Sequence, residues 1–291
     1  MTAALRGKDA DDYRSISAAG GLAGWIRKDL PEKLFAEFIR DPDSLMDPAS
    51  SQVLKDGPKT KVVRHIFQDG RGVPLNVIVK RFHYRTGLRR LGFFFFPSPA
   101  LRCLRGALLL KSTGVLVPAP LAALEYRSWR NLGTSYYVTE EVGDSHSIRE
   151  FWRSVVRPLP RNKRPGLRRA VLRDLARLLA DLHSMNIYHR DLKTSNILVQ
   201  GSAGEPRRLF LIDLDRVKER PRLPLSKRAS NLFQVRQRWR NPRLQIFFLM
   251  RYAERCCPSK DDAKALVRRI LSLSRRIKAS RRRKRKRFAQ G

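Results

Sequence analysis

The chain has 291 residues, enough for one domain of two lobes or for two small domains. Its 62 lysine and arginine residues exceed its 26 acidic residues, which gives a formal net charge of +36. A charge of this size favours polyanionic partners, either nucleic acid or the anionic face of a membrane. Three cysteines supply neither a disulfide framework nor zinc-ligand spacing, and no uncharged run reaches the roughly 20 apolar residues of a membrane-spanning helix. The composition indicates a cytosolic protein whose contact with any membrane is peripheral.

The first 50 residues are mixed in character. An apolar stripe at helical spacing runs through them, formed by Trp25, Ile26, Leu30, Leu34, Phe35, Phe38 and Ile39. Pro31 is compatible with the first turn of such a helix. The pattern predicts an N-terminal helical extension over residues 1–50, with contact to a membrane as the alternative role of its apolar face.

Residues 51–142 have the pattern of a small β-rich lobe. Two β-branched runs, residues 62–67 and 77–80, flank a turn-forming cluster rich in glycine, and residues 136–142 predict a further strand that ends in a connector. The second run ends in Lys80, as the V-A-I-K strand of kinases ends in its lysine. This position makes Lys80 a candidate for the α- and β-phosphates of ATP, and a solvated strand-edge lysine is the alternative.

A helix is expected over residues 101–111, after the strand of Lys80. Protein kinases place a glutamate on this helix as the partner of the strand lysine. Here the helix offers Arg102, Arg105 and Lys111, and no acidic residue occurs between Asp69 and Glu125. The usual lysine–glutamate pair is therefore absent from its normal place.

Two further segments of this lobe are candidates for nucleotide contacts. The loop of residues 55–61 contains a single glycine, and its Lys59 and Thr60 are candidates for phosphate binding through backbone N–H groups and side chains. Backbone groups from Glu140 to Val142, in the connector between the lobes, are candidates for hydrogen bonds with adenine.

The middle of the chain carries the most informative motif. Residues 188–199 read YHRDLKTSNILV and contain H-R-D-x-x-x-x-N, with Asp191 as its aspartate and Asn196 as its asparagine. Asp213 follows the apolar run 209–212. Asp191 can accept a proton from an attacking hydroxyl, and Asn196 and Asp213 offer oxygen ligands to Mg²⁺. The set predicts ATP-dependent phosphoryl transfer, in which Lys193 stabilises charge on the transferring group.

Residues 143–279 are expected to form a mostly helical catalytic lobe. Apolar residues at helical spacing between Leu167 and Leu182 predict a core helix, after which His183 is expected to be a packed structural residue. A second stripe predicts a helix over residues 266–277. It leads into seven consecutive basic residues, 281–287, within a predicted basic disordered tail of residues 280–291. The segment after Asp215 has no long insert for docking a peptide, which favours a small or glycolipid acceptor.

Several of these segments resemble the lipopolysaccharide kinases of the Kdo/WaaP family, a branch of the protein-kinase-like fold. The resemblance extends over residues 53–252. It rests on Lys80 after a β-branched strand, on GVLVPAPLA at residues 114–122 (the family has G-I-x-T-P-x-P-L-A), on YVTE at 137–140, on the Asp191 loop, on LIDLDR at 211–216 in place of D-F-G, and on RASNL at 228–232.

The resemblance implies an α+β, two-lobed, protein-kinase-like fold, with a small antiparallel β-sheet lobe, a mostly helical large lobe and a basic C-terminal tail. It implies transfer of the γ-phosphate of ATP to a hydroxyl of an inner-core sugar of lipopolysaccharide, either heptose or Kdo. Such an enzyme works in the cytoplasm, peripherally at the inner membrane of a Gram-negative cell. The charge of +36 fits a polyanionic acceptor glycolipid and an anionic membrane surface.

Two alternatives belong to other classes. One is an RNA-linked kinase of the RIO-like type, which the basic charge would suit, although those kinases typically carry H-G-D where this chain has H-R-D. The other is a pseudokinase that binds a membrane or nucleic acid without catalysis. Retention of Lys80, Asp191, Asn196 and Asp213 together argues against this second alternative.

Overall fold

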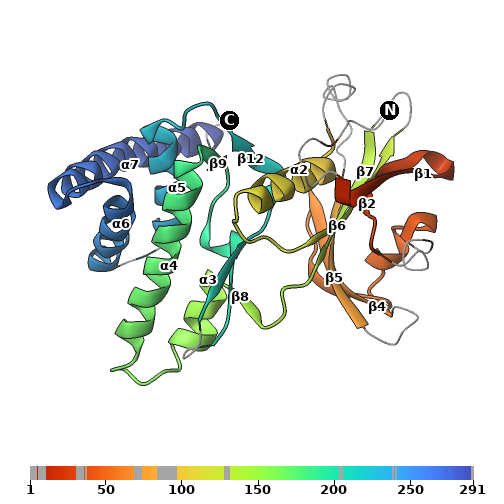
Figure 1. Cartoon of the computed structure of the whole chain (residues 1–291), viewed down its shortest axis with the longest axis horizontal. Helices are drawn as coiled ribbons and strands as arrows, with labels where there is room; N and C mark the ends of the chain where they lie inside the picture. The colour runs from red at the N-terminus through yellow and green to blue at the C-terminus, as the bar shows by residue number, and fades with distance from the viewer. Residues whose placement is uncertain are drawn as a thin grey trace. The chain divides into compact units, whose positions relative to one another are not determined.

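The structure, a computed structural model (Figure 1), describes residues 5, 11–30, 36, 38–68, 74–83, 97–127, 132–202, 206–237, 239 and 241–289. The chain divides into two compact units. Unit 1 consists of residues 1–143 and 213–216, and unit 2 consists of residues 144–212 and 217–291. The short segment 213–216 therefore belongs to the first unit although its neighbours in sequence belong to the second.

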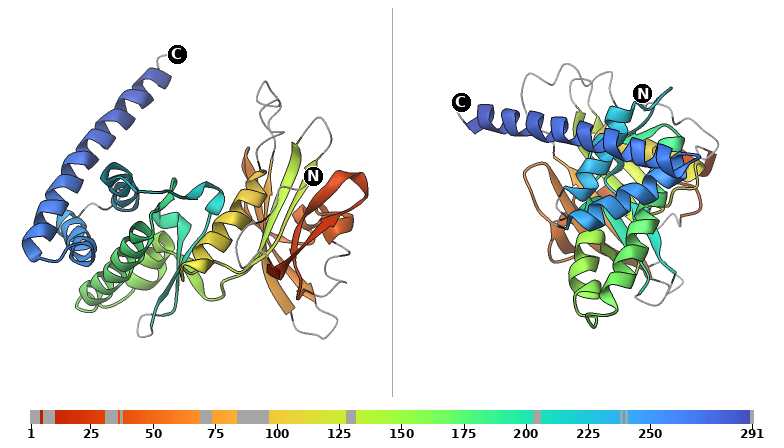
Figure 2. Two further views of the ribbon diagram at one scale, coloured as in Figure 1. Left: turned by 45° about the horizontal axis from the view of Figure 1, so that its top comes forward. Right: turned by 90° about the vertical axis from the view of Figure 1, so that its left-hand side faces the viewer.

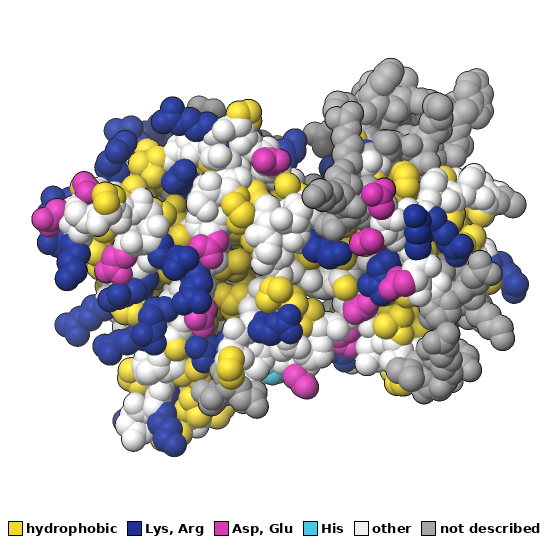
Figure 3. Space-filling model, viewed as in Figure 1, with side chains coloured by type: hydrophobic (Ala, Val, Ile, Leu, Met, Phe, Trp, Pro, Cys, Tyr) yellow, Lys and Arg dark blue, Asp and Glu magenta, His cyan; other side chains and the backbone are white. Residues whose placement is uncertain are grey.

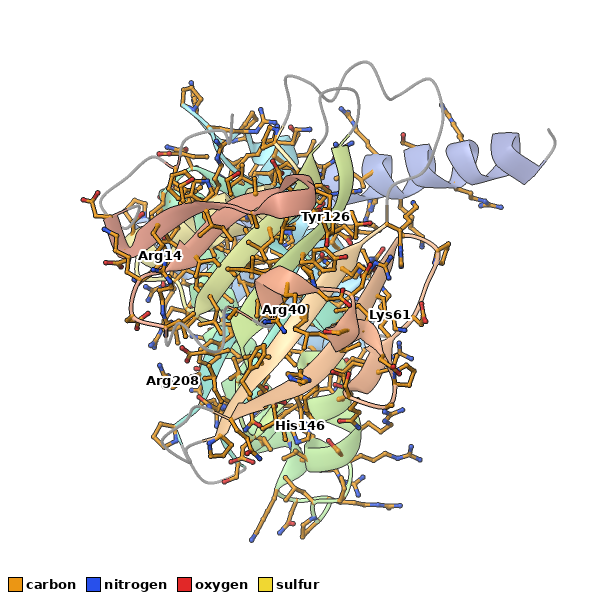
Figure 4. The ribbon with its side chains drawn as sticks, turned by 90° about the vertical axis from the view of Figure 1, so that its right-hand side faces the viewer. Arg14, Arg40, Lys61, Tyr126, His146 and Arg208 are labelled. Carbon is orange, nitrogen blue, oxygen red and sulfur yellow. The ribbon has the colours of Figure 1, made fainter. Side chains whose placement is uncertain are left out.

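Unit 1 is built on a seven-stranded antiparallel sheet (Figure 4, where Lys61 marks β4 and Tyr126 marks β6). Its strands are β1 (Tyr13–Ser17), β2 (Leu22–Arg27), β3 (Gln52–Lys55), β4 (Thr60–Gln68), β5 (Pro74–Phe82), β6 (Pro120–Arg127) and β7 (Leu132–Glu140). Their order in the sheet is β1-β2-β6-β7-β5-β4-β3. The helix α2 (Pro99–Ser112) and the short turns η2 (Ala19–Gly21), η3 (Ser44–Met46) and η7 (Leu214–Arg216) complete the described elements of this unit.

The sheet has an apolar core on each face. Because successive strand residues point to opposite faces, Val77 and Val79 of β5 pack on one side with a cluster that includes Tyr136. Phe82, on the other side, packs with residues of α2 such as Leu104. Lys80 has the same parity as Phe82, so β5 presents it on the face that α2 covers.

The helix predicted over residues 101–111 is confirmed as α2. It begins where the Ser98 side chain accepts a hydrogen bond from the Leu101 N–H at 3.1 Å, with Pro99 in the first turn. It ends before Gly114, whose φ of 76° suits a residue without a side chain. The strands predicted at residues 62–67, 77–80 and 136–142 are confirmed as β4, β5 and β7.

The N-terminal segment differs from the predicted helical extension. Trp25 and Ile26 lie in β2, where their side chains alternate between the two faces of the sheet. The strand also depends on Gly24, because a Cβ atom there would lie 2.2 Å from the Ala123 carbonyl oxygen of β6. Phe38 is helical and buried, while residues 31–35 of the predicted stripe lie outside the described residues. The sequence pattern predicts a helix here because the apolar residues of this short strand also fit a helical spacing.

Unit 2 combines small sheets with helices. Its strands are β8 (Ser145–Ser147), β9 (Ile187–His189), β10 (Ile197–Gln200), β11 (Arg208–Leu211) and β12 (Val217–Glu219), which pair in the orders β11-β10-β8 and β12-β9. Its helices are α3 (Ile148–Phe151), α4 (Arg164–Ser184), α5 (Leu225–Arg236), α6 (Pro242–Cys256) and α7 (Lys260–Ala289), with the helical turns η5 (Trp152–Val156) and η6 (Thr194–Asn196). The predicted core helix is confirmed as α4, which packs against α6.

The C-terminal helix is longer than the sequence pattern predicts. Figure 2 shows α7 as one continuous helix that extends past the other helices of its unit. The structure is helical from Lys260 to Ala289, whereas a disordered tail was predicted from residue 280. Arginine and lysine have high helix propensity, so a helix that is already nucleated by packed residues can continue through a basic run. No helix among the described residues combines the length and hydropathy needed to cross a bilayer.

Candidate active site

The strand lysine of unit 1 has an acidic partner. Nζ of Lys80 lies 2.5 Å from Oδ1 of Asp213, and both side chains are largely shielded from solvent. The ammonium group also lies 4.7 Å from the centre of the Phe82 ring. Burial lowers the pKa of Lys80, but its acidic neighbours, Asp213 foremost, together more than offset this, and the net effect raises the pKa above its ordinary value. Lys80 is therefore held as a cation that can bind phosphate.

Asp213 occupies an unusual backbone position. Its φ of 65° lies in the left-handed region, which aspartate and asparagine adopt more readily than most residues. The turn η7 follows it at once and packs against α2. Asp215, in this turn, is partly buried, and burial followed by repulsion from Asp213 raises the pKa of its carboxyl group. Two carboxylates thus share the surroundings of Lys80.

Cys103, on α2, interacts electrostatically with Lys80. Its side chain is buried, and burial raises the pKa of the thiol to about 12 despite the opposing effect of Lys80. A neutral thiol cannot replace the glutamate that kinases carry on this helix. Asp213 supplies the negative charge instead, which is how this chain accommodates the missing helix glutamate.

Part of the backbone at the connector after β7 forms hydrogen bonds with other residues of unit 1. The Glu140 N–H donates to the Ala119 carbonyl and the Glu141 N–H donates to the Asn76 carbonyl, each at 2.9 Å. The carboxylates pair with arginines: Glu140 lies 2.9 Å from Arg27, and Glu141 pairs with Arg64. The N–H groups of Glu140 and Glu141 are therefore engaged within the protein, and adenine binding by residues 140–142 stays a prediction.

The two predicted phosphate-binding residues lie at the end of the turn between β3 and β4 (Lys59) and at the first position of β4 (Thr60). The Thr60 N–H donates to the Gly57 carbonyl at 3.3 Å, and the Lys59 carbonyl accepts from the His83 N–H at 3.0 Å. Pro58 has no N–H to offer. The turn thus engages part of its own backbone, so phosphate contacts here would depend mainly on the Lys59 and Thr60 side chains.

In unit 2, Asp191 lies in the loop between β9 and η6. Nζ of Lys193 lies 2.8 Å from Oδ2 of Asp191, and both side chains are partly exposed. The Asn196 amide donates from Nδ2 to the Asp191 carbonyl at 2.9 Å. The Asp191 N–H donates to Nδ1 of His189 at 3.2 Å. The loop therefore brings Asp191, Lys193 and Asn196 together, as the motif predicts, and holds the Asp191 backbone from both sides.

The strand pair β10–β11 links Asn196 to the segment that precedes Asp213. The Ile212 N–H donates to the Asn196 carbonyl at 3.0 Å, and Ile197 is in register with Leu211. Asp213 is the next residue along the chain. The hairpin therefore holds Ile212, the residue that precedes Asp213, against the backbone of Asn196.

Two buried residues of α5 hold the same loop by its backbone. Gln234 donates to the Arg190 carbonyl at 2.8 Å and accepts from the Leu192 N–H at 3.0 Å. Asn231 donates to the His189 carbonyl at 2.6 Å. Neither residue was predicted as part of the site, although RASNL at residues 228–232 includes Asn231. The signal available was the pair of amides three residues apart on one helix face.

His183 is a structural residue of this network, as the sequence predicts. Its Nδ1 lies 2.9 Å from the Tyr252 hydroxyl and its Nε2 lies 3.3 Å from Oδ1 of Asn231. The side chain is fully buried, and burial lowers its pKa to about 4. The ring is therefore neutral at neutral pH and serves as a packed hydrogen-bonding group.

The predicted metal ligands have suitable chemistry. Magnesium prefers oxygen donors. Asp213 provides a carboxylate in unit 1, with the Asp215 carboxylate near it. In unit 2 the Asn196 amide nitrogen donates to the Asp191 carbonyl, and its oxygen, a donor atom of the type that magnesium prefers, accepts a hydrogen bond from the Ser195 hydroxyl at 3.4 Å. Among the described residues there is no cluster of three or more histidine, cysteine, aspartate or glutamate side chains that would form a metal site of another kind.

Protein-kinase-like phosphotransferases use a strand lysine, an aspartate after a hairpin and an H-R-D loop with an asparagine, and this chain has each of these elements. The chain belongs to the lipopolysaccharide kinase (Kdo/WaaP) family, whose family model matches residues 100–251. This membership agrees with the predicted class of enzyme, a kinase with a hydroxyl acceptor.

Two relatives agree with this assignment. The lipopolysaccharide core heptose(I) kinase WaaP of Pseudomonas aeruginosa is 30% identical over 120 residues, which cover 39% of this chain and 38% of that protein. The match thus spans well under half of the relative's length. A solved structure described as WaaP in complex with acyl carrier protein is 23% identical, with a TM-score of 0.52 over 89% of this chain and 99% of that one. This likeness confirms the predicted kinase-like α+β fold.

Proposed function

We propose that this protein transfers the γ-phosphate of ATP to a sugar hydroxyl, on heptose or Kdo, in the inner core of lipopolysaccharide. The observation that carries the proposal is the Asp191 loop, in which Lys193 lies 2.8 Å from the Asp191 carboxylate and Asn196 is bonded to the Asp191 carbonyl. Family membership supports lipopolysaccharide as the acceptor. The enzyme would act at the cytoplasmic face of the inner membrane, where ATP and the growing glycolipid meet.

Asp191 is the proposed general base. Its carboxylate is partly exposed, so an acceptor hydroxyl can reach it, and its backbone is fixed by His189 and Asn196. The carboxylate would take the hydroxyl proton as the oxygen attacks the γ-phosphorus and the bond to the ADP oxygen breaks. Lys193, beside the carboxylate, would stabilise negative charge on the transferring phosphoryl group.

Nucleotide binding is assigned to groups in unit 1. Lys80 would bind the α- and β-phosphates, exchanging its bond to Asp213 for bonds to phosphate oxygens. Lys59 and Thr60 would contact phosphate, and the backbone from Glu140 to Val142 would contact adenine. Asn196 and Asp213 are the proposed magnesium ligands. Bound magnesium would neutralise charge on the β- and γ-phosphates.

The test is phosphate transfer to a defined acceptor. Purified full-length protein is incubated with Mg-ATP and core-truncated lipopolysaccharide, and the product is analysed by mass spectrometry. We expect a mass increase of one phosphate, located on an inner-core sugar by fragmentation. Acyl carrier protein, the partner named for the solved WaaP structure, is added in a parallel arm to test whether it supports a stable or more active enzyme.

The same experiment addresses the two alternatives. An RNA-linked kinase would leave lipopolysaccharide unmodified while it binds RNA and phosphorylates itself or a protein. A pseudokinase would modify no acceptor even with saturating Mg-ATP. Absence of phosphate on every inner-core acceptor, under conditions where the protein binds ATP, would overturn the proposed function.

A further inference from the structure

The helix α7 has a well-defined buried face. Ala263, Val267, Ile270 and Ser274 are each at most 5% exposed. Their spacing of four, three and four residues places them on one side of the helix. This side packs against α5 and α6 of the same unit. The orientation of α7 about its own axis is therefore fixed over this part of its length.

The opposite face carries a repeat of paired arginines. The pairs are Arg268–Arg269, Arg275–Arg276 and Arg282–Arg283, and all six side chains are exposed. Seven residues turn an α-helix through almost two full turns, so the three pairs stay in line and drift by only about 20° per repeat. We refer to these six residues as the arginine stripe. By helical geometry its mean direction lies on the side of α7 opposite the buried face.

The arginine stripe extends along several turns of α7. Successive pairs are about 10 Å apart along the axis and the three pairs span roughly 20 Å. The acidic residues of α7, Asp261 and Asp262, lie in its first turn, and no acidic residue follows them in the sequence. Figure 3 shows lysine and arginine side chains gathered over the helices of unit 2. The stripe is therefore a straight positive row without local compensation on the same helix.

We propose that the arginine stripe docks unit 2 onto an anionic lipid bilayer by binding the phosphates of lipid headgroups. Arginine suits this role because its planar guanidinium group can bind a phosphate through two hydrogen bonds. A straight row held on the surface of a packed helix fits a flat array of phosphates. The inference rests in part on the proposed function, because a lipopolysaccharide acceptor places the reaction at a membrane.

The composition of α7 favours a bilayer over nucleic acid. Proteins that bind single-stranded nucleic acid usually add aromatic side chains on which the bases stack. Residues 260–287 contain no aromatic residue. The stripe thus offers phosphate binding alone, and the acceptor of the proposed reaction supplies the reason for a membrane partner.

Binding of full-length protein to vesicles tests the proposal. The vesicles are phosphatidylcholine with or without phosphatidylglycerol, and binding is measured by co-sedimentation at two salt concentrations. One variant replaces Arg268, Arg275 and Arg282 by glutamine. The matched control replaces Arg169, Arg173 and Arg177, three exposed arginines on one face of α4, by glutamine. Both variants lose three positive charges from the same unit.

We expect the stripe variant to bind anionic vesicles at least about tenfold more weakly than the parent, since each basic residue at an anionic surface contributes severalfold to affinity. The control should change by less than about threefold, because charges farther than a Debye length from the surface are screened. The parent should bind weakly to pure phosphatidylcholine and lose affinity for anionic vesicles at high salt.

Three results would overturn the proposal. Equal weakening of both variants would mean that net charge alone drives binding. Absence of vesicle binding by the parent would exclude a bilayer partner. Strong RNA binding in a gel shift at matched salt, with no vesicle binding, would assign the stripe to nucleic acid. Activity of both variants on detergent-solubilised acceptor is measured separately, so failure of the proposed kinase reaction would be recognised independently.

Discussion

Lys80 and Asp213 form an ion pair of 2.5 Å within unit 1, although 132 residues of chain separate them. This pair connects the strand that would bind the phosphates of ATP with the aspartate that would bind magnesium. Protein kinases divide this work among a strand lysine, a helix glutamate and an aspartate. The helix α2 has no glutamate, and its residue near Lys80 is the neutral Cys103. Lys80, which would bind the phosphates of ATP, is therefore positioned by Asp213, the aspartate that would bind magnesium.

Replacing Asp213 by asparagine should weaken magnesium-dependent ATP binding. Asparagine tolerates the φ of 65° at this position, so the loss of charge is separated from backbone strain, which alanine would introduce. Removing a carboxylate from a hard cation should lower the affinity for Mg-ATP by about tenfold or more. Isothermal titration with and without magnesium provides the measurement.

The control for this variant is Asp12→Asn, which removes a charge from an exposed carboxylate of the same unit, 3.5 Å from Lys111. It should bind Mg-ATP nearly as the parent does. If the parent itself bound ATP equally with and without magnesium, the role assigned to Asp213 would be wrong.

Replacing Asp191 by alanine should abolish most catalysis and leave the fold intact. The side chain is partly exposed and pairs with Lys193, so little packing is lost. Loss of a general base reduces turnover by about 10² or more. The measurement is the rate of phosphate transfer, with circular dichroism as the check on folding. Asp181→Asn, at a surface carboxylate paired with Arg255, is the matched control. Near-normal turnover of the Asp191 variant would remove this loop from the mechanism.

Much of this arrangement could be predicted from the sequence because the informative segments are short and local. The H-R-D-x-x-x-x-N spacing brings Asp191 and Asn196 together within one loop, and the structure places them there. The β-branched run before Lys80 predicts β5, and the leucine spacing predicts α4. In each case the residues that define the pattern also make the contacts.

Other features depend on partners distant in sequence. The pairing of Lys80 with Asp213 requires the chain to return from the hairpin of unit 2 to unit 1, and no local pattern encodes it. Trp25 and Ile26 follow both a helical and a strand spacing, and pairing of β2 with β6 decides between them. The sequence alone does not distinguish Gln234 from the other polar residues, because its contact with the loop depends on where α5 packs.

Replacing Gln234 by leucine should slow catalysis by misplacing the loop of Asp191. Gln234 is a positioning residue, since it bonds to the backbone of Arg190 and Leu192 and acts through Asp191. We expect kcat to fall about 10- to 100-fold while the KM for ATP changes little, as expected when geometry at the reacting group is lost. Stability should also fall by about 1–3 kcal/mol, because backbone groups of the loop lose their partner.

The comparison for this variant is Gln237→Leu, at the exposed residue that immediately follows α5. It should leave kcat close to that of the parent. If the role of Gln234 were purely structural, the variant would be less stable and would contain less active enzyme. The turnover per folded molecule would stay normal when the number of folded molecules is determined by titration of ATP sites. That result would contradict positioning.

The last prediction concerns pH and His183. Burial, and then the positive charge of Arg228, lower the pKa of His183 to about 4, against the opposing effect of its Asn231 hydrogen bond, while its ordinary value is 6.5. Between these values the unfolded chain takes up a proton on His183 that the folded chain does not. The folded state is therefore fully stabilised above about pH 6.5, and this contribution is lost as the pH falls toward 4.

The corresponding slope is up to about 1.4 kcal/mol of unfolding free energy per pH unit, or about 3 kcal/mol over the whole interval. Urea unfolding at a series of pH values between 7 and 4 measures it. His183→Gln keeps a hydrogen-bonding side chain next to Tyr252 and Asn231 but cannot titrate, so its stability should depend less steeply on pH than that of the parent. His146→Gln, at an exposed position on β8, should keep the parental slope. If the His183 variant retained the full slope as well, the acid sensitivity would belong to other groups and His183 would not be buried as a neutral ring.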